Sequence, residues 1–139
     1  VVLATADADD RALLCLFNAS YGPAWVTGDG QRIVGWKVGI PLMEWSRVDE
    51  KDGRAVGLKL YLCNLMGFIP QELGQLTFLQ TLDLGNNKLF GSIPPELGWL
   101  RALRTLDLYN NELSGPIPPE LGELSELQEL NLSKNHFVG

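Results

Sequence analysis

Two aspartates recur at the same place in a repeated pattern, and they are the side chains best spaced to act as a catalytic pair. Asp83 and Asp107 each follow a Thr-Leu dipeptide, 24 residues apart. On adjacent strands, about 4.8 Å apart, two carboxylates approach the separation found in retaining glycosidases. A regular ladder of strands places carboxylates in this way without any catalytic need, and no general-acid partner accompanies them. We therefore expect the chain not to be an enzyme.

Other side chains capable of metal or redox chemistry are few. The 139 residues include two cysteines, Cys15 and Cys63, and one histidine, His136, without a CxxC motif. This set offers a metal ion almost no ligands and forms no disulfide framework. We expect no metal site and no cofactor, and we interpret Cys63 as a structural free thiol.

Composition narrows the classes of partner. The net charge is −6 at pH 7, and lysines and arginines are scattered along the chain, which argues against nucleic acid and anionic membrane surfaces as partners. No apolar run reaches the roughly 18 residues that span a bilayer, so we expect no membrane insertion in this segment. An apolar fraction of 45% is enough for one continuous core.

Leucine, asparagine and glycine recur with a period of 24 residues, which is the strongest signal in the chain. Leu76, Leu100 and Leu124 share one position, and Asn87, Asn111 and Asn135 share another. A degenerate first repeat places Cys63 in the asparagine column. The remaining columns are Leu79/Leu103/Leu127, Leu58/Leu82/Leu106/Leu130, Leu60/Leu84/Leu108/Leu132, Leu65/Leu89/Leu113, Gly67/Gly91/Gly115/Gly139 and Ile69/Ile93/Ile117.

Each column predicts a local structure. The xLxLx stretch alternates, which predicts a strand with its leucines pointing to the core, and stacked repeats then form a parallel sheet. The asparagine follows the strand, where its amide can satisfy backbone groups of the turn and of the neighbouring repeat. Glycine in LxGxIP permits a bend, and IPPELG suits a short 3₁₀ or helical turn.

The unit LxxLxxLxLxxNxLxGxIPxELGx resembles the plant-specific class of leucine-rich repeats, and the match covers residues 55–139. The resemblance implies a right-handed α/β solenoid with a parallel concave sheet, 3₁₀ or short helical turns on the convex side and a helical N-terminal cap. We divide the chain into a cap, 1–54, and about 3.5 repeats, 55–139, whose C-terminal end is uncapped.

The cap resembles those that precede such repeats. Residues 7–20 predict a helix, Gly22-Pro23 breaks the chain, and Trp25, Trp36 and Trp45 are expected to cover the first repeat. A sugar-binding aromatic platform is the alternative role for these tryptophans. Plant forms carry a CxWxGVxC motif, but Met43 and Glu50 occupy the cysteine positions here, so the cap is disulfide-free and resembles bacterial, algal or oomycete caps.

The concave face is the binding surface that the resemblance implies. Four columns of variable side chains are expected there, with Tyr61 and Tyr109 as anchors, because interface hot spots favour tyrosine. Asp83 and Asp107 could meet a cationic group of a partner. The candidate partner-binding residues are Lys59, Tyr61, Asp83, Asn86, Asp107, Tyr109, Asn110 and Asn131.

Recognition of a protein partner, in a fragment of a larger receptor-like or signalling protein, is the function we favour. A carbohydrate-binding or hydrolase-inhibitor role is one alternative. An architectural module that self-associates through the uncapped end near Leu130 is another. The resemblance favours an extracellular or cell-surface location over a cytoplasmic one.

Overall fold

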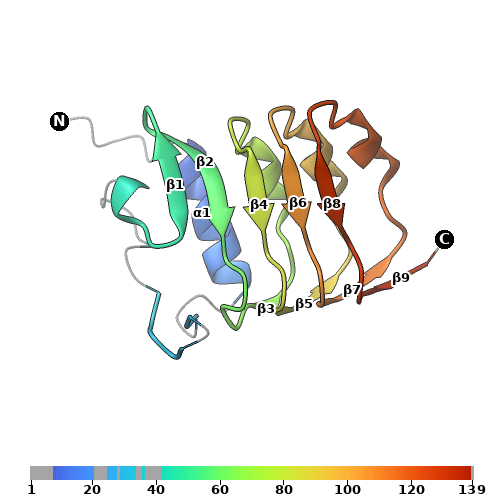
Figure 1. Ribbon diagram of the computed structural model, residues 1–139, viewed down its shortest axis with the longest axis horizontal. Helices are drawn as coiled ribbons and strands as arrows, with labels where there is room; N and C mark the ends of the chain where they lie inside the picture. Colours follow the sequence, from blue (N-terminus) through green and yellow to red (C-terminus); the bar gives the residue numbers. More distant parts are fainter. Residues whose placement is uncertain (1–7, 21–24, 28, 34–35, 37–41, 139) are drawn as a thin grey trace.

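The computed structural model describes residues 8–20, 25–27, 29–33, 36 and 42–138. The chain winds into stacked turns, with a helix and a short hairpin at one end (Figure 1). The cap contains α1 (Ala8–Ala19), the 3₁₀ turn η2 (Leu42–Glu44) and β1 (Val48–Lys51). The repeats contain β2 (Arg54–Lys59), β3 (Met66–Gly67), η3 (Gln71–Gln75), β4 (Thr81–Asp83), β5 (Lys88–Gly91), η4 (Pro95–Trp99), β6 (Thr105–Asp107), β7 (Glu112–Gly115), η5 (Pro119–Glu123), β8 (Glu129–Asn131) and β9 (His136–Phe137). Of the predicted helix 7–20, Asp7 lies outside the described residues, as does the Gly22-Pro23 break.

Two sheets run along the stack. The larger has the order β1-β2-β4-β6-β8, and its strands are parallel except for the antiparallel β1–β2 pair. Leu58, Leu82, Leu106 and Leu130 are in register across it, which confirms the 24-residue columns. The smaller sheet, β3-β5-β7-β9, occupies the LxGxIP segment, where the sequence predicted only a bend. Gly67, Gly91 and Gly115 have positive φ in this sheet, so both the bend and the pairing exist.

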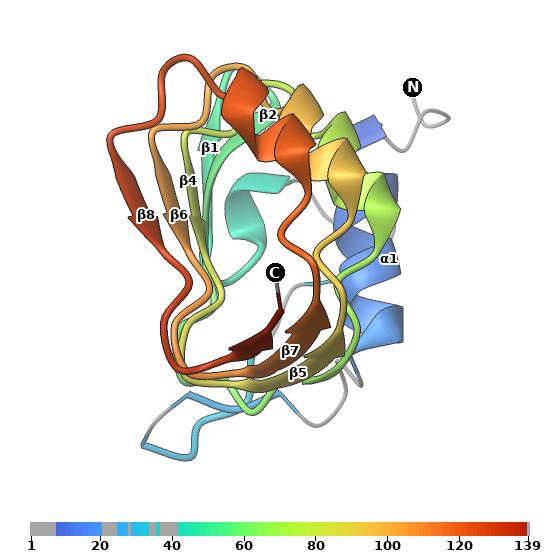
Figure 2. The ribbon, with the colours of Figure 1, turned by 90° about the vertical axis from the view of Figure 1, so that its right-hand side faces the viewer.

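The 3₁₀ turns form the third side of each coil, as expected (Figure 2). Each follows a proline that precedes the turn in extended conformation, and α1 packs beside η3 at the cap end. Gly98 lets adjacent turns approach closely, because a Cβ there would lie 2.6 Å from the carbonyl oxygen of Glu120. The exposed Trp99 ends η4 on this side of the stack.

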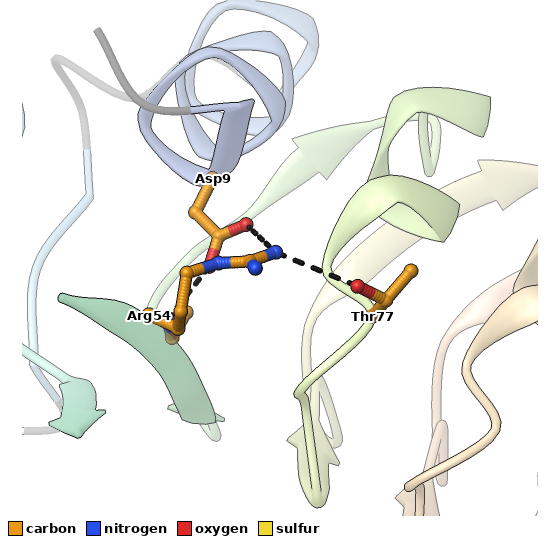
Figure 3. A network of polar contacts seen from close by, with 4 residues as sticks. Asp9, Arg54 and Thr77 are labelled. Carbon is orange, nitrogen blue, oxygen red and sulfur yellow. Dashed lines mark hydrogen bonds and ion pairs between the residues drawn. The ribbon is translucent and has the colours of Figure 1, made fainter. Parts of the chain in front are cut away.

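A buried ion pair ties the cap to the first repeat (Figure 3). Asp9 of α1 is fully buried and accepts hydrogen bonds from Arg54 Nε (3.0 Å), Arg54 Nη2 (2.9 Å) and the Ala55 N–H (2.8 Å). Arg54 Nη2 also donates to Thr77 Oγ1 at 3.4 Å, and its guanidinium lies 4.3 Å from the centroid of the Phe78 ring. Because the paired charge is hydrogen-bonded on both oxygens, its burial is compensated, and the helix is fixed against β2.

The cap tryptophans belong to the core. Trp25, Trp36 and Trp45 are 0%, 5% and 2% exposed, and their rings form a chain with centroid separations of 4.8 and 5.3 Å. The indole N–H groups of Trp25 and Trp36 donate to the carbonyls of Ser20 and Ser46. The three rings therefore pack in the core, and because they are at most 5% exposed they offer no open face to a sugar.

The asparagine column links each repeat to the one before it. Asn87 Oδ1 accepts from the N–H groups of Cys63 and Leu65, both at 3.0 Å, and its Nδ2 donates to the Leu60 carbonyl at 2.8 Å. Asn111 and Asn135 repeat the arrangement one and two turns later. Cys63 follows the cap and has no repeat before it to bridge, so a small buried thiol suffices there; its Sγ donates to the Tyr61 carbonyl.

Candidate binding face

The outward side of the five-stranded sheet presents a regular array of polar and aromatic side chains. On β4 and β6 the central leucine is buried in the core, so its two neighbours point outward. We call this surface the ladder face; its members include Lys59, Tyr61, Asp83, Asp107, Tyr109 and Asn131, six of the eight candidate residues.

Asp83 and Asp107 are directly paired across β4 and β6, as predicted. Each carboxylate also has a structural task, because its Oδ1 accepts the N–H two residues on: Gly85 at 3.0 Å and Tyr109 at 2.8 Å. Burial raises the pKa of Asp83, the Gly85 N–H lowers it, and the charge of Asp107 raises it further. Neither carboxylate has an ion-pair partner among the described residues. The pair therefore carries uncompensated negative charge.

The two tyrosines stand on either side of a glycine. Tyr61, Gly85 and Tyr109 follow the ends of successive strands, so the tyrosines are two strand spacings, roughly 10 Å, apart. Tyr61 is 50% exposed, and its Cδ2 lies 3.4 Å from where a Cβ on Gly85 would be. The Lys134 ammonium lies 5.3 Å from the centroid of the Tyr109 ring, and hydrogen bonding to Tyr109 raises the pKa of Lys134. The face thus already holds one cation on an aromatic ring.

Lys59 and Asn131 lie in register with Asp83 and Asp107, at the two ends of the same row, and they differ from the aspartates in charge. The Lys59 ammonium pairs with Asp49 Oδ2 at 2.9 Å, so the cap strand β1 supplies its counter-charge. Asn131 Oδ1 accepts from the N–H of Ser133 at 3.1 Å, which repeats the aspartate arrangement with a neutral group. The paired negative charge is therefore concentrated at the centre of the ladder face.

One predicted column does not lie on the strands. Leu62, Asn86, Asn110 and Lys134 have φ values of 52°, 52°, 54° and 54°, so they form a left-handed turn after each strand. The alternation of each strand ends where this turn begins, so Asn86 and Asn110 follow the strands and do not belong to them. Asparagine tolerates this conformation better than most residues, which explains why asparagine occupies positions 86 and 110.

Three of these turn residues, Leu62, Asn86 and Asn110, border a cavity of about 350 Å³ at the cap end of the stack. Its lining comes from the cap and from three successive turns: Val26, Thr27, Leu62, Asn64, Asn86, Asn87, Lys88 and Asn110. The Val26 N–H donates to the Cys63 carbonyl at 3.2 Å, which fixes the cap segment against the first turn. The sequence pointed to Asn86 and Asn110, but nothing in the repeat pattern placed Val26 beside them.

The described residues were compared with the requirements of a metal site, a reactive thiol and a membrane-spanning helix. They contain no group of three or more histidine, cysteine, aspartate or glutamate side chains that could hold a metal ion. Cys15 and Cys63 are free, and burial raises the pKa of both thiols. Within the same described part of the chain, no helix has the length and apolarity needed to span a membrane.

Comparison with known proteins decides the family. The leucine rich repeat model matches residues 77–137. The crystal structure of the BIR3–SERK2 complex from Arabidopsis thaliana contains a chain that is 34% identical; the match covers 91% of this chain and 68% of that one, with a TM-score of 0.75. The chain belongs to the leucine-rich-repeat family. No match was found among curated proteins.

Other similar structures extend the comparison within leucine-rich-repeat proteins. The BIR2 ectodomain from Arabidopsis thaliana is 34% identical over 93% of this chain and 68% of its own, with a TM-score of 0.79. The PEPR1–AtPEP1 structure is 29% identical, with a TM-score of 0.82, but the match covers only 18% of that chain against 95% of this one. The fold is therefore shared with the BIR2 ectodomain and with chains of the BIR3–SERK2 and PEPR1–AtPEP1 structures.

Proposed function

We propose that the chain is a recognition module whose concave ladder face binds a protein partner outside the cell. The observation that carries this proposal is the pairing of Tyr61 and Tyr109 with the uncompensated carboxylates of Asp83 and Asp107 on one surface. Similar solved structures include the BIR2 ectodomain and the ectodomain of the receptor kinase SOBIR1, and the BIR3–SERK2 structure is a complex, which supports a protein partner and extracellular placement.

The chemistry of the ladder face defines what such a partner carries. Tyrosine buries a large rigid surface and keeps a hydroxyl for hydrogen bonding, which is why it dominates interface hot spots. The carboxylate pair favours a basic side chain, and a cation between the two rings would also gain from their faces. The partner therefore presents an arginine or lysine to the centre of this surface, and its binding weakens as salt is raised.

A matched pair of variants tests the proposal. Partners are captured from extracellular extract on the immobilised protein, identified, and measured individually by surface plasmon resonance against Tyr61→Ala/Tyr109→Ala and Trp99→Ala. Trp99 is 55% exposed on a different side of the molecule, so it controls for loss of an exposed aromatic ring. We expect the tyrosine variant to bind about 30-fold more weakly, from roughly 2 kcal/mol of hot-spot energy. Equal affinity of the tyrosine variant and the parent would refute the proposal.

We also propose the structural details that the repeat pattern implies. They are the right-handed winding, the plant-specific repeat class, the disulfide-free cap type and the division at residues 54 and 55. We further propose that the protein self-associates through the last repeat, where Leu130 is 50% exposed. Sedimentation at increasing concentration tests it, because a strict monomer at every concentration would exclude it.

A further inference from the structure

The cavity beside the left-handed turns combines an apolar wall, an amide edge and a cation. Val26 and Leu62 supply the wall, Asn86 and Asn110 supply the amides, and Lys88 supplies the charge. Its volume of about 350 Å³ is at the lower end of the range for ligand sites, which suits a group as small as one or two amino-acid residues.

Leu62 is the unusual member of its column. It has φ 52° and is 49% exposed, although the equivalent positions 86 and 110 hold asparagine, the residue that this conformation favours. A leucine here gives up a favourable backbone choice and leaves apolar surface in water. The exposed leucine side chain forms part of the apolar wall of the cavity.

The two asparagines form one hydrogen-bonding edge. Asn110 Nδ2 donates to Asn86 Oδ1 at 2.7 Å. This bond occupies one half of each amide, and among the described residues the Nδ2 of Asn86 and the Oδ1 of Asn110 have no further partner. A donor and an acceptor are thus presented side by side, which matches the C=O and N–H of an extended peptide main chain.

Lys88 adds a positive charge to this edge of an acidic protein. Its side chain is exposed at the cavity and has no ion-pair partner among the described residues. A carboxylate close to the bound main chain would therefore be attracted to the site. None of the described residues that line the cavity is aromatic, so these residues offer no ring to a sugar face.

We propose that this cavity binds an extended peptide segment of the partner, with an apolar side chain against Leu62 and Val26, its main chain on Asn86 and Asn110, and a carboxylate on Lys88. The inference deepens the proposed function and rests on it, because it names the chemistry of a second contact next to the ladder face. The carboxylate belongs either to a chain terminus or to an acidic side chain.

Nuclear magnetic resonance with short peptides tests the site directly. The probes are acetyl-Gly-Gly-Leu with a free carboxylate, acetyl-Gly-Leu-Glu-amide, acetyl-Gly-Gly-Leu-amide, acetyl-Gly-Gly-Ser with a free carboxylate, and cellobiose. We expect one or both of the first two to shift the side-chain amide signals of Asn86 and Asn110 in a saturable way, and which of them binds identifies the source of the carboxylate. The third and fourth probes are expected to bind at least about fivefold more weakly. Absence of saturable shifts with both leading peptides, or tighter binding of cellobiose, would overturn the proposal.

Three variants separate binding from folding. Leu62→Asn removes the apolar wall and installs the residue that the turn prefers, so it is expected to lose at least about fivefold in peptide affinity while its unfolding midpoint is unchanged or higher. Asn110→Gly keeps the left-handed turn and removes the amide, and Lys88→Met keeps the apolar stem and removes the charge. Unchanged peptide affinity in Leu62→Asn would overturn the pocket proposal. Partner affinity of the Tyr61→Ala/Tyr109→Ala variant is measured separately, so failure of the pocket and failure of the ladder face give different results.

Discussion

Replacing Asn111 with alanine tests whether the asparagine column holds the stack together. Asn111 is 6% exposed; its Oδ1 accepts from the Leu89 N–H at 3.0 Å, and its Nδ2 donates to the Leu84 and Leu108 carbonyls at 3.0 and 3.2 Å. Those two carbonyls keep other donors, because Asn87 Nδ2 reaches Leu84 and Asn135 Nδ2 reaches Leu108. The substitution therefore leaves one buried donor, the Leu89 N–H, without its partner.

The magnitude follows from this accounting. An unsatisfied buried donor costs about 1–3 kcal/mol, and two lost hydrogen bonds to carbonyls that remain bonded cost roughly 0.5–1.5 kcal/mol each, so we expect a loss of about 2–6 kcal/mol, centred near about 4 kcal/mol. Asn135→Ala is the matched control: it makes equivalent bonds to Leu113 N–H and the Leu108 carbonyl, but it is only partly buried, so water can replace them. Its expected loss is about 1–2 kcal/mol.

Urea unfolding, followed by circular dichroism and tryptophan fluorescence under reducing conditions, measures both variants. Three of the four tryptophans, Trp25, Trp36 and Trp45, precede the first parallel strand, so fluorescence measured in a Trp99→Phe background reports on the cap. Circular dichroism reports on the repeats as well, so coincident transitions show that the stack unfolds as one unit. With a slope of about 1.5 kcal/mol/M, Asn111→Ala shifts the midpoint down by roughly 3 M. Equal losses in the two variants, or a loss in Asn111→Ala below about 1 kcal/mol, would refute the accounting.

Three further variants probe other parts of the stack. Asp83→Asn is expected to be more stable than the parent by about 0.5–1 kcal/mol at pH 7. Because the pKa of Asp83 is raised in the folded state, this gain in stability appears as the pH rises through that pKa and is absent below about pH 4. A pH-independent difference between the urea midpoints of the two proteins would contradict the prediction. Gly98→Ala is expected to lose about 1–3 kcal/mol, whereas Gly122→Ala, whose added Cβ would meet nothing within 4 Å, is neutral or slightly stabilising in thermal unfolding; similar losses in both would contradict the packing argument. Cys63→Asn is expected to lose about 1–3 kcal/mol, since the new amide would have no preceding repeat to bridge, and a stabilised variant in the same assay would disprove this explanation of the cysteine.

Much of the fold was predictable because each repeat column has one dominant physical role. Leucines at 82 and 106 alternate with polar residues, which defines the strand and its buried side without knowledge of neighbours. The asparagine column was equally predictable, because a buried amide after a strand must find backbone partners. The second sheet was missed because glycine at positions 67, 91 and 115 indicates a bend, and two-residue pairing at a bend leaves no alternation to read.

The candidate site was predictable only where it follows the repeat. Asp83, Asp107 and the two tyrosines lie on one face because strand register places them there. By contrast, the cap interrupts the period, so nothing in the sequence located Val26 beside the turn or Asp49 beside Lys59. The left-handed turn was also missed, because a leucine at position 62 conceals the conformational preference that the asparagines at 86 and 110 reveal.

Hydroxyl-radical footprinting of the protein with its captured partner tests the central claim most directly. Tyr61, Phe78 and Trp99 are 50%, 52% and 55% exposed, so their oxidation reports on three regions with similar starting accessibility. Binding on the ladder face predicts strong protection of Tyr61, with Phe78 and Trp99 oxidised as in the free protein. Protection of Trp99 or Phe78, with Tyr61 unchanged, would contradict the account.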